Sequence, residues 1–339
     1  MNATHRIASM RKSLEGLALG DALGRALRVA PSDDPTFDEP PWVYTDDTEM
    51  AIAIAQLLAR RGRIVQDELA QMFAARFAAN PERGYGGVTY ASLSRISAGH
   101  DWRGVVTQPY GGKGSLGNGA AMRVGPLGAY FADDLPRLVE EATLSAAVTH
   151  AHPEGQAGAV AVALAAAIAA TRAGADRTSL REVADNVTPG QVHALVQCAA
   201  DLGDISPRQA GAVLGTGLRI SAHDTVPYAL WCAFGNLRDY RAAQLAAIAG
   251  FDSPASDRDT ICAIVGSIVA LSCEDSTIPP DWTAQREALP EDVKAVPVRL
   301  EFVVRPPLGA GPGPGSGRPN AHYSTRRGRG ARGSISPVV

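Results

Sequence analysis

The sequence has few aromatic residues, few cysteines and no long hydrophobic run, and each shortage excludes a class of protein. Aromatic residues make up 6% of the 339 residues. A β-sandwich depends on aromatic and β-branched side chains, whereas abundant alanine and glycine suit closely packed helices. The longest apolar run, residues 157–170, is shorter than the roughly 20 residues that a membrane-spanning helix needs. We therefore expect a buried core helix there and no membrane partner.

The cysteines form no Cys-x-x-Cys pair and lie in apolar surroundings, at Cys198, Cys232, Cys262 and Cys273. Buried free thiols are the ordinary state of such residues in a reducing compartment, and disulfides are the less favoured alternative. Residues 1–14 are mixed and charged and contain no apolar core of a signal peptide. We therefore expect a cytoplasmic protein.

Charge is nearly balanced over the whole chain only because a basic C-terminal end offsets a more acidic body. The formal net charge is −3, which gives no general reason to expect nucleic acid as a partner. Residues 301–339 contain fourteen glycine and proline residues, clustered arginines and a single acidic residue. Such a segment cannot bury enough apolar surface to offset its chain entropy. We expect a folded domain over residues 1–290 and a disordered basic tail over residues 300–339, for which nucleic-acid binding is the alternative interpretation.

Apolar residues recur at helical spacing along nearly all of the remaining chain, and no long run alternates with period two. Short Gly, Pro and Asp turns separate the helical stretches. The sequence therefore predicts an all-α domain. The main expected helices cover residues 118–130, 135–148, 154–172, 189–202, 227–235, 240–250 and 259–271.

Two acidic clusters about 210 residues apart each precede an apolar helical stretch. They are Thr45-Asp46-Asp47-Thr48-Glu49, before a helix expected from Met50, and Ser256-Asp257-Arg258-Asp259-Thr260. Capping explains either cluster alone, because Thr and Asp are good N-caps and acids complement the helix dipole. One cap needs only one such side chain, however, and adjacent carboxylates repel one another unless a cation lies between them. Six oxygen ligands, four of them carboxylates, would suit two Mg²⁺ or Mn²⁺ ions, and no His or Cys set favours zinc.

Two glycine-containing segments lie near these clusters in the sequence. Residues 111–119 are dense in glycine, which allows a backbone to approach a phosphate or sugar closely, although a plain loop is the alternative. Residues 16–24 carry small residues at four-residue spacing, which serves close helix packing, and Asp21 among them is a candidate to support the acidic site. His150 follows an expected helix and either contacts a ligand or satisfies the end of that helix.

In combination, these motifs resemble the ADP-ribosylglycohydrolase family. The pairing of Thr-Asp-Asp-Thr with Asp-x-Asp-Thr, with GNGAAMR between them, is the specific part of the resemblance. The similar segments occur in the family's order: GLALGDALG at 16–24, YTDDTEMAIAIA at 44–55, RGYGG at 83–87, GSLGNGAAMRVGPLG at 114–128, THAHPEG at 149–155, DRDTICAIVGSIVAL at 257–271 and IPPDW at 278–282.

The resemblance implies a single orthogonal multi-helix bundle that holds two Mg²⁺ or Mn²⁺ ions. It implies hydrolysis of the bond between ribose C1″ and an ADP-ribosylated acceptor, a protein side chain above all, with free ADP-ribose as product. The implied metal ligands are Thr45, Asp46, Asp47, Asp257, Asp259 and Thr260. The implied substrate-binding residues are Gly114, Ser115, Leu116, Gly117, Asn118 and His150. A bound cation lowers the pKa of water, and we expect Asp46 or Asp259 to accept its proton.

The sequence departs from the family pattern at two arginines. Many relatives carry a glutamate seven residues after the aspartate of the Gly-Asp-x-x-Gly motif, whereas Arg28 stands here. If that glutamate is a base in relatives, another acid must replace it, and the candidates are Asp33, Asp34, Asp38 and Glu39. Arg258 stands where several relatives have a small or hydroxyl residue, and it would either point outward or bind a phosphate.

Two other functions remain open from the sequence alone. One is a dinuclear metal hydrolase of another ADP-ribose-like small molecule, because the motifs specify the metals and the nucleotide more than the leaving group. The other is an inactive ADP-ribose-binding module, which Arg28 favours and the six intact ligands oppose. Nucleic acid is not indicated as a partner by the core.

Overall fold

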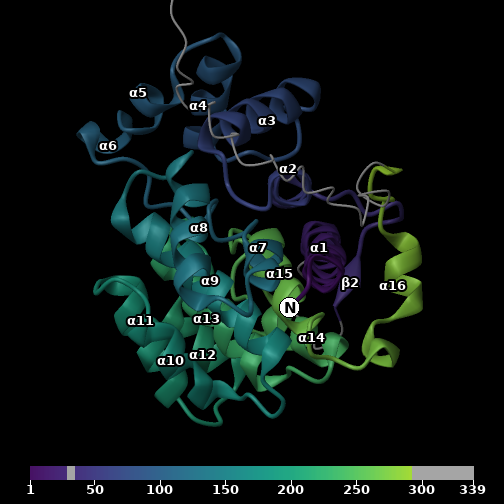
Figure 1. Cartoon of the computed structure of the whole chain (residues 1–339). Coiled ribbons are helices and arrows are strands. Elements are labelled where there is room, and N and C mark those ends of the chain that lie inside the picture. The colour runs from purple at the N-terminus through teal and green to yellow at the C-terminus, as the bar shows by residue number, and fades with distance from the viewer. Residues whose placement is uncertain (29–34, 292–339) are drawn as a thin grey trace, which may run out of the picture. The chain divides into compact units, whose positions relative to one another are not determined.

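The computed structural model describes residues 1–28 and 35–291, and in them the protein is almost entirely helical (Figure 1). The predicted all-α class is confirmed. The strands of this part are limited to β1 (Leu27–Arg28) and β2 (Thr36–Phe37), an antiparallel pair with Leu27 opposite Phe37. The predicted C-terminal tail lies outside the described residues.

Short turns connect the helices, as the sequence predicts. The first half of the domain contains α1 (Ala3–Ala26), α2 (Asp46–Arg61), α3 (Gln66–Ala79), α4 (Gly87–Ser97), α5 (Trp102–Val106), α6 (Pro109–Gly112), α7 (Gly125–Tyr130) and α8 (Leu135–Ala147). The second half contains α9 (Pro153–Thr171), η1 (Arg177–Ser179), α10 (Leu180–Asp185), α11 (Gln191–Asp201), α12 (Pro207–Leu214), α13 (Ala222–Gly235), α14 (Tyr240–Ala249), α15 (Arg258–Val269), η2 (Asp275–Thr277) and α16 (Pro280–Gln285).

The central contact of the fold joins α1 to α15, which lie far apart in the sequence. Gly16, Gly20 and Gly24 lie one turn apart on α1 and face the backbone of α15. A Cβ atom on Gly20 would overlap the carbonyl oxygen of Cys262, and one on Gly24 would overlap that of Arg258. The four-residue glycine spacing therefore lets the two backbones touch, as predicted.

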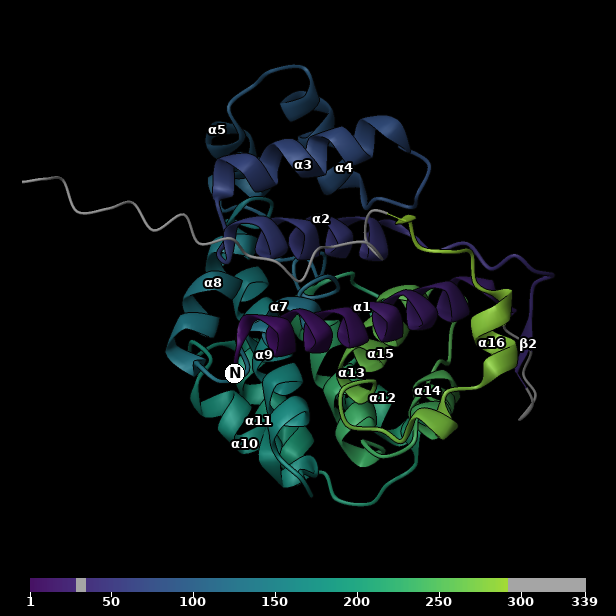
Figure 2. The same ribbon diagram turned by 45° about the vertical axis from the view of Figure 1, so that its right-hand side comes forward.

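This contact determines where the two acidic clusters meet. Helix α1 lies between α2 and α15 and packs against both (Figure 2). The first turn of α2 contains Asp46 and Asp47, and the first turn of α15 contains Asp259. Close packing of α15 on α1 brings Asp259 beside Asp21, whose carboxyl group feels its charge. The packing of small residues therefore brings residues from distant parts of the sequence into one site.

Helix α9 forms part of the core. It is the one helix within residues 1–28 and 35–291 that is long and apolar enough to cross a bilayer, but 78% of its apolar window is buried inside the domain. Its buried alanine, valine and leucine side chains pack against α7, α8 and α13. The prediction of a buried core helix is confirmed. All four cysteines are free; Cys198 is half-buried and the other three are buried.

Several helix boundaries differ from those expected. Helix α2 begins at Asp46 rather than Met50, so the first acidic cluster forms its first turn instead of preceding it. The helix expected over 118–130 begins only at Gly125, since residues 119–123 form turns after the glycine-rich segment. Helix α13 begins at Ala222 and includes Pro227.

Candidate active site

Asp21 of α1 accepts hydrogen bonds from the first acidic cluster and so fixes its position. Its Oδ2 accepts hydrogen bonds from the Thr45 backbone N–H (2.9 Å) and the Thr48 hydroxyl (2.6 Å). The Thr45 hydroxyl lies 2.8 Å from Asp21 Oδ1 and 3.0 Å from Asp47 Oδ2. Burial raises the pKa of Asp21 to about 7, and the negative charge of Asp259 adds to this effect. The predicted supporting role of Asp21 is thus seen in its contacts with the start of α2.

A second set of contacts, hydrogen bonds and an ion pair with Glu287, fixes the residue that precedes this cluster. The Tyr44 N–H donates to Glu287 (2.8 Å), and Arg83 forms an ion pair with Glu287 and donates to the Tyr44 carbonyl (2.7 Å). Glu49 pairs with Arg76 and Arg83 and so belongs to this outer network rather than to a ligand set. The sequence analysis included Arg83 in the RGYGG segment but missed its pairing with Glu287, because the two residues lie 204 positions apart.

The second acidic cluster is held mainly through Asp257. This residue occupies the N-cap position of α15, but its side chain makes no capping hydrogen bond. Instead its Oδ2 accepts from the Asn118 amide (2.6 Å), and the same amide nitrogen donates to Thr225 (2.9 Å). Capping therefore does not explain Asp257, while Thr45 does cap α2 through the Asp47 N–H.

The carboxylates of the two clusters act on one another electrostatically. Burial, followed by the charges of Asp259 and Asp21, raises the pKa of Asp46 well above its usual range. Burial and the charge of Asp259 also raise the pKa of Asp257 well above its usual range. Burial and the charge of Asp21 raise the pKa of Asp47 in the same way. So much negative charge in one buried place requires protons or a cation.

The donor set fits a hard divalent cation by its chemistry. It offers carboxylate and hydroxyl oxygens, and Oδ1 of Asp47 is buried without a hydrogen-bond partner among the described residues. Within residues 1–28 and 35–291, however, no three His, Cys, Asp or Glu side chains are arranged so that they could hold a metal ion by themselves. The structure thus brings the predicted carboxylates into one site but does not converge three of them on one point.

A cavity of about 300 Å³ opens beside these carboxylates, and we call it the nucleotide-side cavity because the resemblance implies nucleotide binding by residues of its lining. The predicted residues that line it are Asp46, Asp47, Ser115, Gly117, Asn118, His150, Asp257, Asp259 and Thr260. Thr45, Gly114 and Leu116 are not part of its lining. Tyr110 and Arg219 also line it, and the sequence analysis singled out neither.

Buried Arg123 fixes the orientation of His150. The Arg123 guanidinium donates to the Gly119 carbonyl (3.1 Å) and to the Thr149 hydroxyl oxygen (2.9 Å). The same hydroxyl oxygen lies 2.7 Å from Nδ1 of His150 and forms a hydrogen bond with it. Burial lowers the pKa of His150 to about 3, so the ring is neutral. The other ring nitrogen, Nε2, lies on the side of Gly117 and Gly119.

The two unusual arginines both lie away from the carboxylates. Arg28 is exposed and pairs with Asp38 (2.6 Å) beside the short β-ribbon. Arg258 donates to the Leu27 carbonyl (2.6 Å), which supports the outward orientation over phosphate binding. Asp38 and Glu39 line a separate cavity near Arg258, so neither replaces the expected glutamate in this structure. The other two candidate acids, Asp33 and Asp34, lie outside the described residues.

The fold and the cavity are those of an enzyme rather than of a purely structural bundle, because buried carboxylates with raised pKa values line an open cavity. The sequence profile of ADP-ribosylglycohydrolase matches residues 2–304. The chain therefore belongs to the ADP-ribosylglycohydrolase family, which confirms the predicted family and hydrolase class.

Individual relatives agree with this assignment. The chain is 25% identical to the ADP-ribosylhydrolase ARH3 of Homo sapiens, over 85% of this chain and 92% of the relative. It is 33% identical to ARH3 of Xenopus tropicalis, but there the match spans only 41% of the relative's length. It is 25% identical to the ADP-ribosylarginine hydrolase Tri1 of Serratia proteamaculans, over 80% and 73% of the two chains.

A solved structure supports the fold. It is described as an ADP-ribosylglycohydrolase-related protein complex and matches with a TM-score of 0.53 at 23% identity. The match covers 86% of this chain and 96% of the other.

Proposed function

We propose that this protein is a metal-dependent hydrolase that releases ADP-ribose from an ADP-ribosylated acceptor, a protein side chain above all. One observation carries the proposal: the two acidic clusters share a cavity with the Asn118 loop and His150. The relatives named above are an ADP-ribosylhydrolase and an ADP-ribosylarginine hydrolase, which supports the same class of substrate here.

We further propose that the six predicted ligands hold two Mg²⁺ or Mn²⁺ ions: Thr45, Asp46, Asp47, Asp257, Asp259 and Thr260. When bound, such cations orient the ribose diol and lower the pKa of a water molecule. Two observations support this ligand set: Oδ1 of Asp47 is buried and has no hydrogen-bond partner in residues 1–28 and 35–291, and the carboxylates raise one another's pKa values.

The chain's own residues supply positioning and proton transfer. The Ser115–Asn118 segment presents backbone and side-chain donors to the diphosphate, and Nε2 of the neutral His150 ring forms a further hydrogen bond with the substrate. Asp46 or Asp259 accepts one proton from the attacking water, whose oxygen forms a bond to C1″. The bond from C1″ to the acceptor breaks, and the acceptor leaves with a proton. The products are ADP-ribose and the unmodified acceptor.

Release of ADP-ribose from a panel of substrates tests this function. The panel contains peptides with serine-linked, arginine-linked and phosphate-linked ADP-ribose and a free small-molecule conjugate of ADP-ribose, each assayed with Mg²⁺, with Mn²⁺ and with a chelator. We expect release that depends on the cation and is lost in Asp259→Ala. Binding of ADP-ribose without release from any linkage would instead support the inactive binding module. Release only from free small molecules would support the alternative small-molecule hydrolase.

A further inference from the structure

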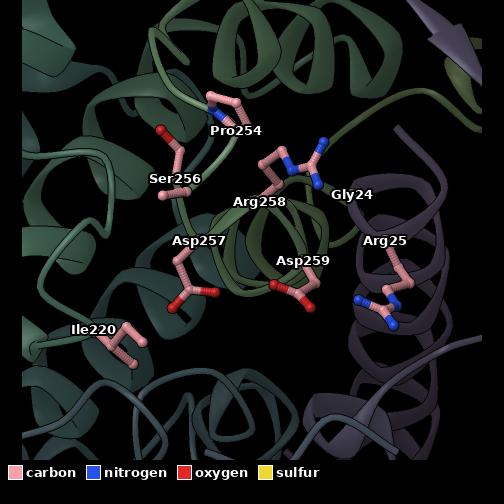
Figure 3. Close-up of a pocket in the computed structure, with 9 residues that line it drawn as sticks. Gly24, Arg25, Ile220, Pro254, Ser256, Asp257, Arg258 and Asp259 are labelled. Carbon is pink, nitrogen blue, oxygen red and sulfur yellow. The ribbon is translucent and has the colours of Figure 1, made fainter. Parts of the chain in front are cut away.

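A second cavity lies against the same carboxylates as the nucleotide-side cavity. It has a volume of about 220 Å³ and is formed by the end of α1, residues 254–257 and the start of α15 (Figure 3). It shares Ile220, Asp257 and Asp259 with the nucleotide-side cavity. These carboxylates therefore line both cavities, and we call the second one the acceptor-side cavity.

The two cavities differ in what their walls offer. The nucleotide-side cavity has the glycine-rich segment and His150, which suit a diphosphate and a sugar. The acceptor-side cavity has neither, but Arg25 and Arg258 line it. A hydrolase that holds ADP-ribose on one side of its carboxylates needs room for the departing group, and the acceptor-side cavity supplies it.

Arg25 is the cation of this cavity that is available to a substrate. It lies in the last turn of α1, is exposed, and no described residue forms a hydrogen bond or ion pair with its side chain. Figure 3 shows the Arg25 guanidinium on the same side of the 254–257 segment as the carboxylates of Asp257 and Asp259. The side chain of Arg258 extends to the opposite side. Arg258 is already engaged by the Leu27 carbonyl.

We propose that the acceptor-side cavity receives the leaving group and that Arg25 selects it by charge, in favour of a hydroxyl side chain of a protein over arginine. This inference rests on the proposed function. In a serine-type linkage, the C1″–O bond breaks and the departing oxygen gains negative charge before it takes a proton. A guanidinium beside that oxygen stabilises the charge. An arginine-type linkage departs from a guanidinium, whose positive charge Arg25 repels.

The test compares kcat/KM for serine-linked and arginine-linked peptides of the same sequence. We expect wild-type protein to prefer the serine linkage. Arg25→Glu should shift the ratio of the two kcat/KM values toward the arginine linkage by roughly five- to tenfold, the size of one partly screened charge contact. Arg25→Lys should keep the wild-type ratio because it keeps the charge. Arg208→Glu is the matched control, since Arg208 is an exposed arginine of α12 that lines none of these cavities.

Each other outcome rejects a defined part of the account. If wild-type protein releases ADP-ribose but Arg25→Glu leaves the ratio unchanged, the assignment of Arg25 is wrong and the proposed function stands. A wild-type preference for arginine, or for phosphate-linked ADP-ribose on nucleic acid, would also overturn it. If wild-type protein releases nothing while it binds ADP-ribose, the proposed function itself fails. Calorimetric binding of ADP-ribose, unchanged in Arg25→Glu, shows that the variant folds.

Discussion

The two halves of the carboxylate site are held in place by different means. The first half, Thr45–Asp47, is buried, donates hydrogen bonds to Asp21 of α1, and is fixed on its other side by the Arg83–Glu287 pair. The second half, Asp257–Thr260, has one long-range side-chain hydrogen bond to a carboxylate, from Asn118, and is positioned by the packing of α15 on α1. One half depends on a polar network and the other on glycine contacts.

This difference shows that a site of like charges can be assembled by packing that is remote from the charges. The carboxylates raise one another's pKa values and do not attract each other. The free energy that brings them together must therefore come from elsewhere, and the buried α1–α15 contact is the main candidate. The predictions below test the two halves separately and then together.

The largest effect is expected from loss of one carboxylate in each half. Asp47→Asn and Asp257→Asn should each lower kcat/KM for ADP-ribose release by about 10³-fold or more, since each removes one proposed ligand. The two variants should differ in stability, because Asn at 47 relieves unpaired negative charge whereas Asn at 257 disturbs its contact with Asn118. Thermal unfolding in chelator measures that difference. Retention of more than a tenth of the activity by either variant would contradict the ligand assignment.

The next largest effect is expected at the crossing of α1 and α15. Gly20→Ala places a methyl group on the carbonyl oxygen of Cys262 and should lower the free energy of unfolding by about 3 kcal/mol. Gly104→Ala in α5 is the control, because a Cβ atom there meets open space. Urea denaturation measures the free energy of unfolding of both variants and of the wild-type protein. Equal stability would show that packing at this crossing does not position the second half.

A smaller effect links pH to cation binding. The folded protein raises the pKa of Asp21 from 3.8 to about 7, so without a cation this residue contributes stability that is fully present below about pH 4 and lost as the pH rises through about 7. The raised pKa values of Asp46, Asp47 and Asp257 act in the same direction. Mg²⁺ should therefore raise the unfolding temperature more at about pH 8 than at about pH 5. An equal increase at both pH values would argue against cation binding by these carboxylates.

The smallest effect is expected at Arg28. This arginine is exposed, and its pair with Asp38 lies on the surface, where such pairs contribute little. Arg28→Ala should change kcat/KM for ADP-ribose release by less than about twofold. A loss of tenfold or more would mean that the position takes part in catalysis despite its placement at the β-ribbon.

Much of the site was predictable because chemistry is concentrated in short motifs. The paired acids with their threonines, the glycine-rich segment and the glycine spacing of α1 are local patterns, and each predicts its own contact. Residues that act through long-range contacts were not predictable in this way. Glu287 follows no motif that marks it as the partner of Arg83, and Arg123 resembles an ordinary surface arginine until its burial is known. The signals for Arg123 were its position in an otherwise apolar segment and at the end of the GNGAAMR motif.

The predicted start of α2 was wrong for a related reason. The periodicity of apolar residues identifies the buried face of a helix. A first turn made of polar residues carries no apolar residues, so this periodicity does not detect it. Helix α2 therefore begins four residues earlier than its apolar pattern, with Asp46 and Asp47 facing the cavity. The start of α15 was predicted to within one residue, because the helix expected from Asp259 begins at Arg258.

The central claim is that the two halves form one cation site, and Mn²⁺ binding tests it most directly. Titration of the wild-type protein, Asp46→Asn and Asp259→Asn by calorimetry, with free Mn²⁺ followed by electron paramagnetic resonance, compares the halves without the need for any substrate. We predict that wild-type protein binds Mn²⁺ and that each substitution, although the two lie in different halves, weakens binding at least tenfold. Full Mn²⁺ affinity in either variant would show that one half binds the cation alone and would contradict the account.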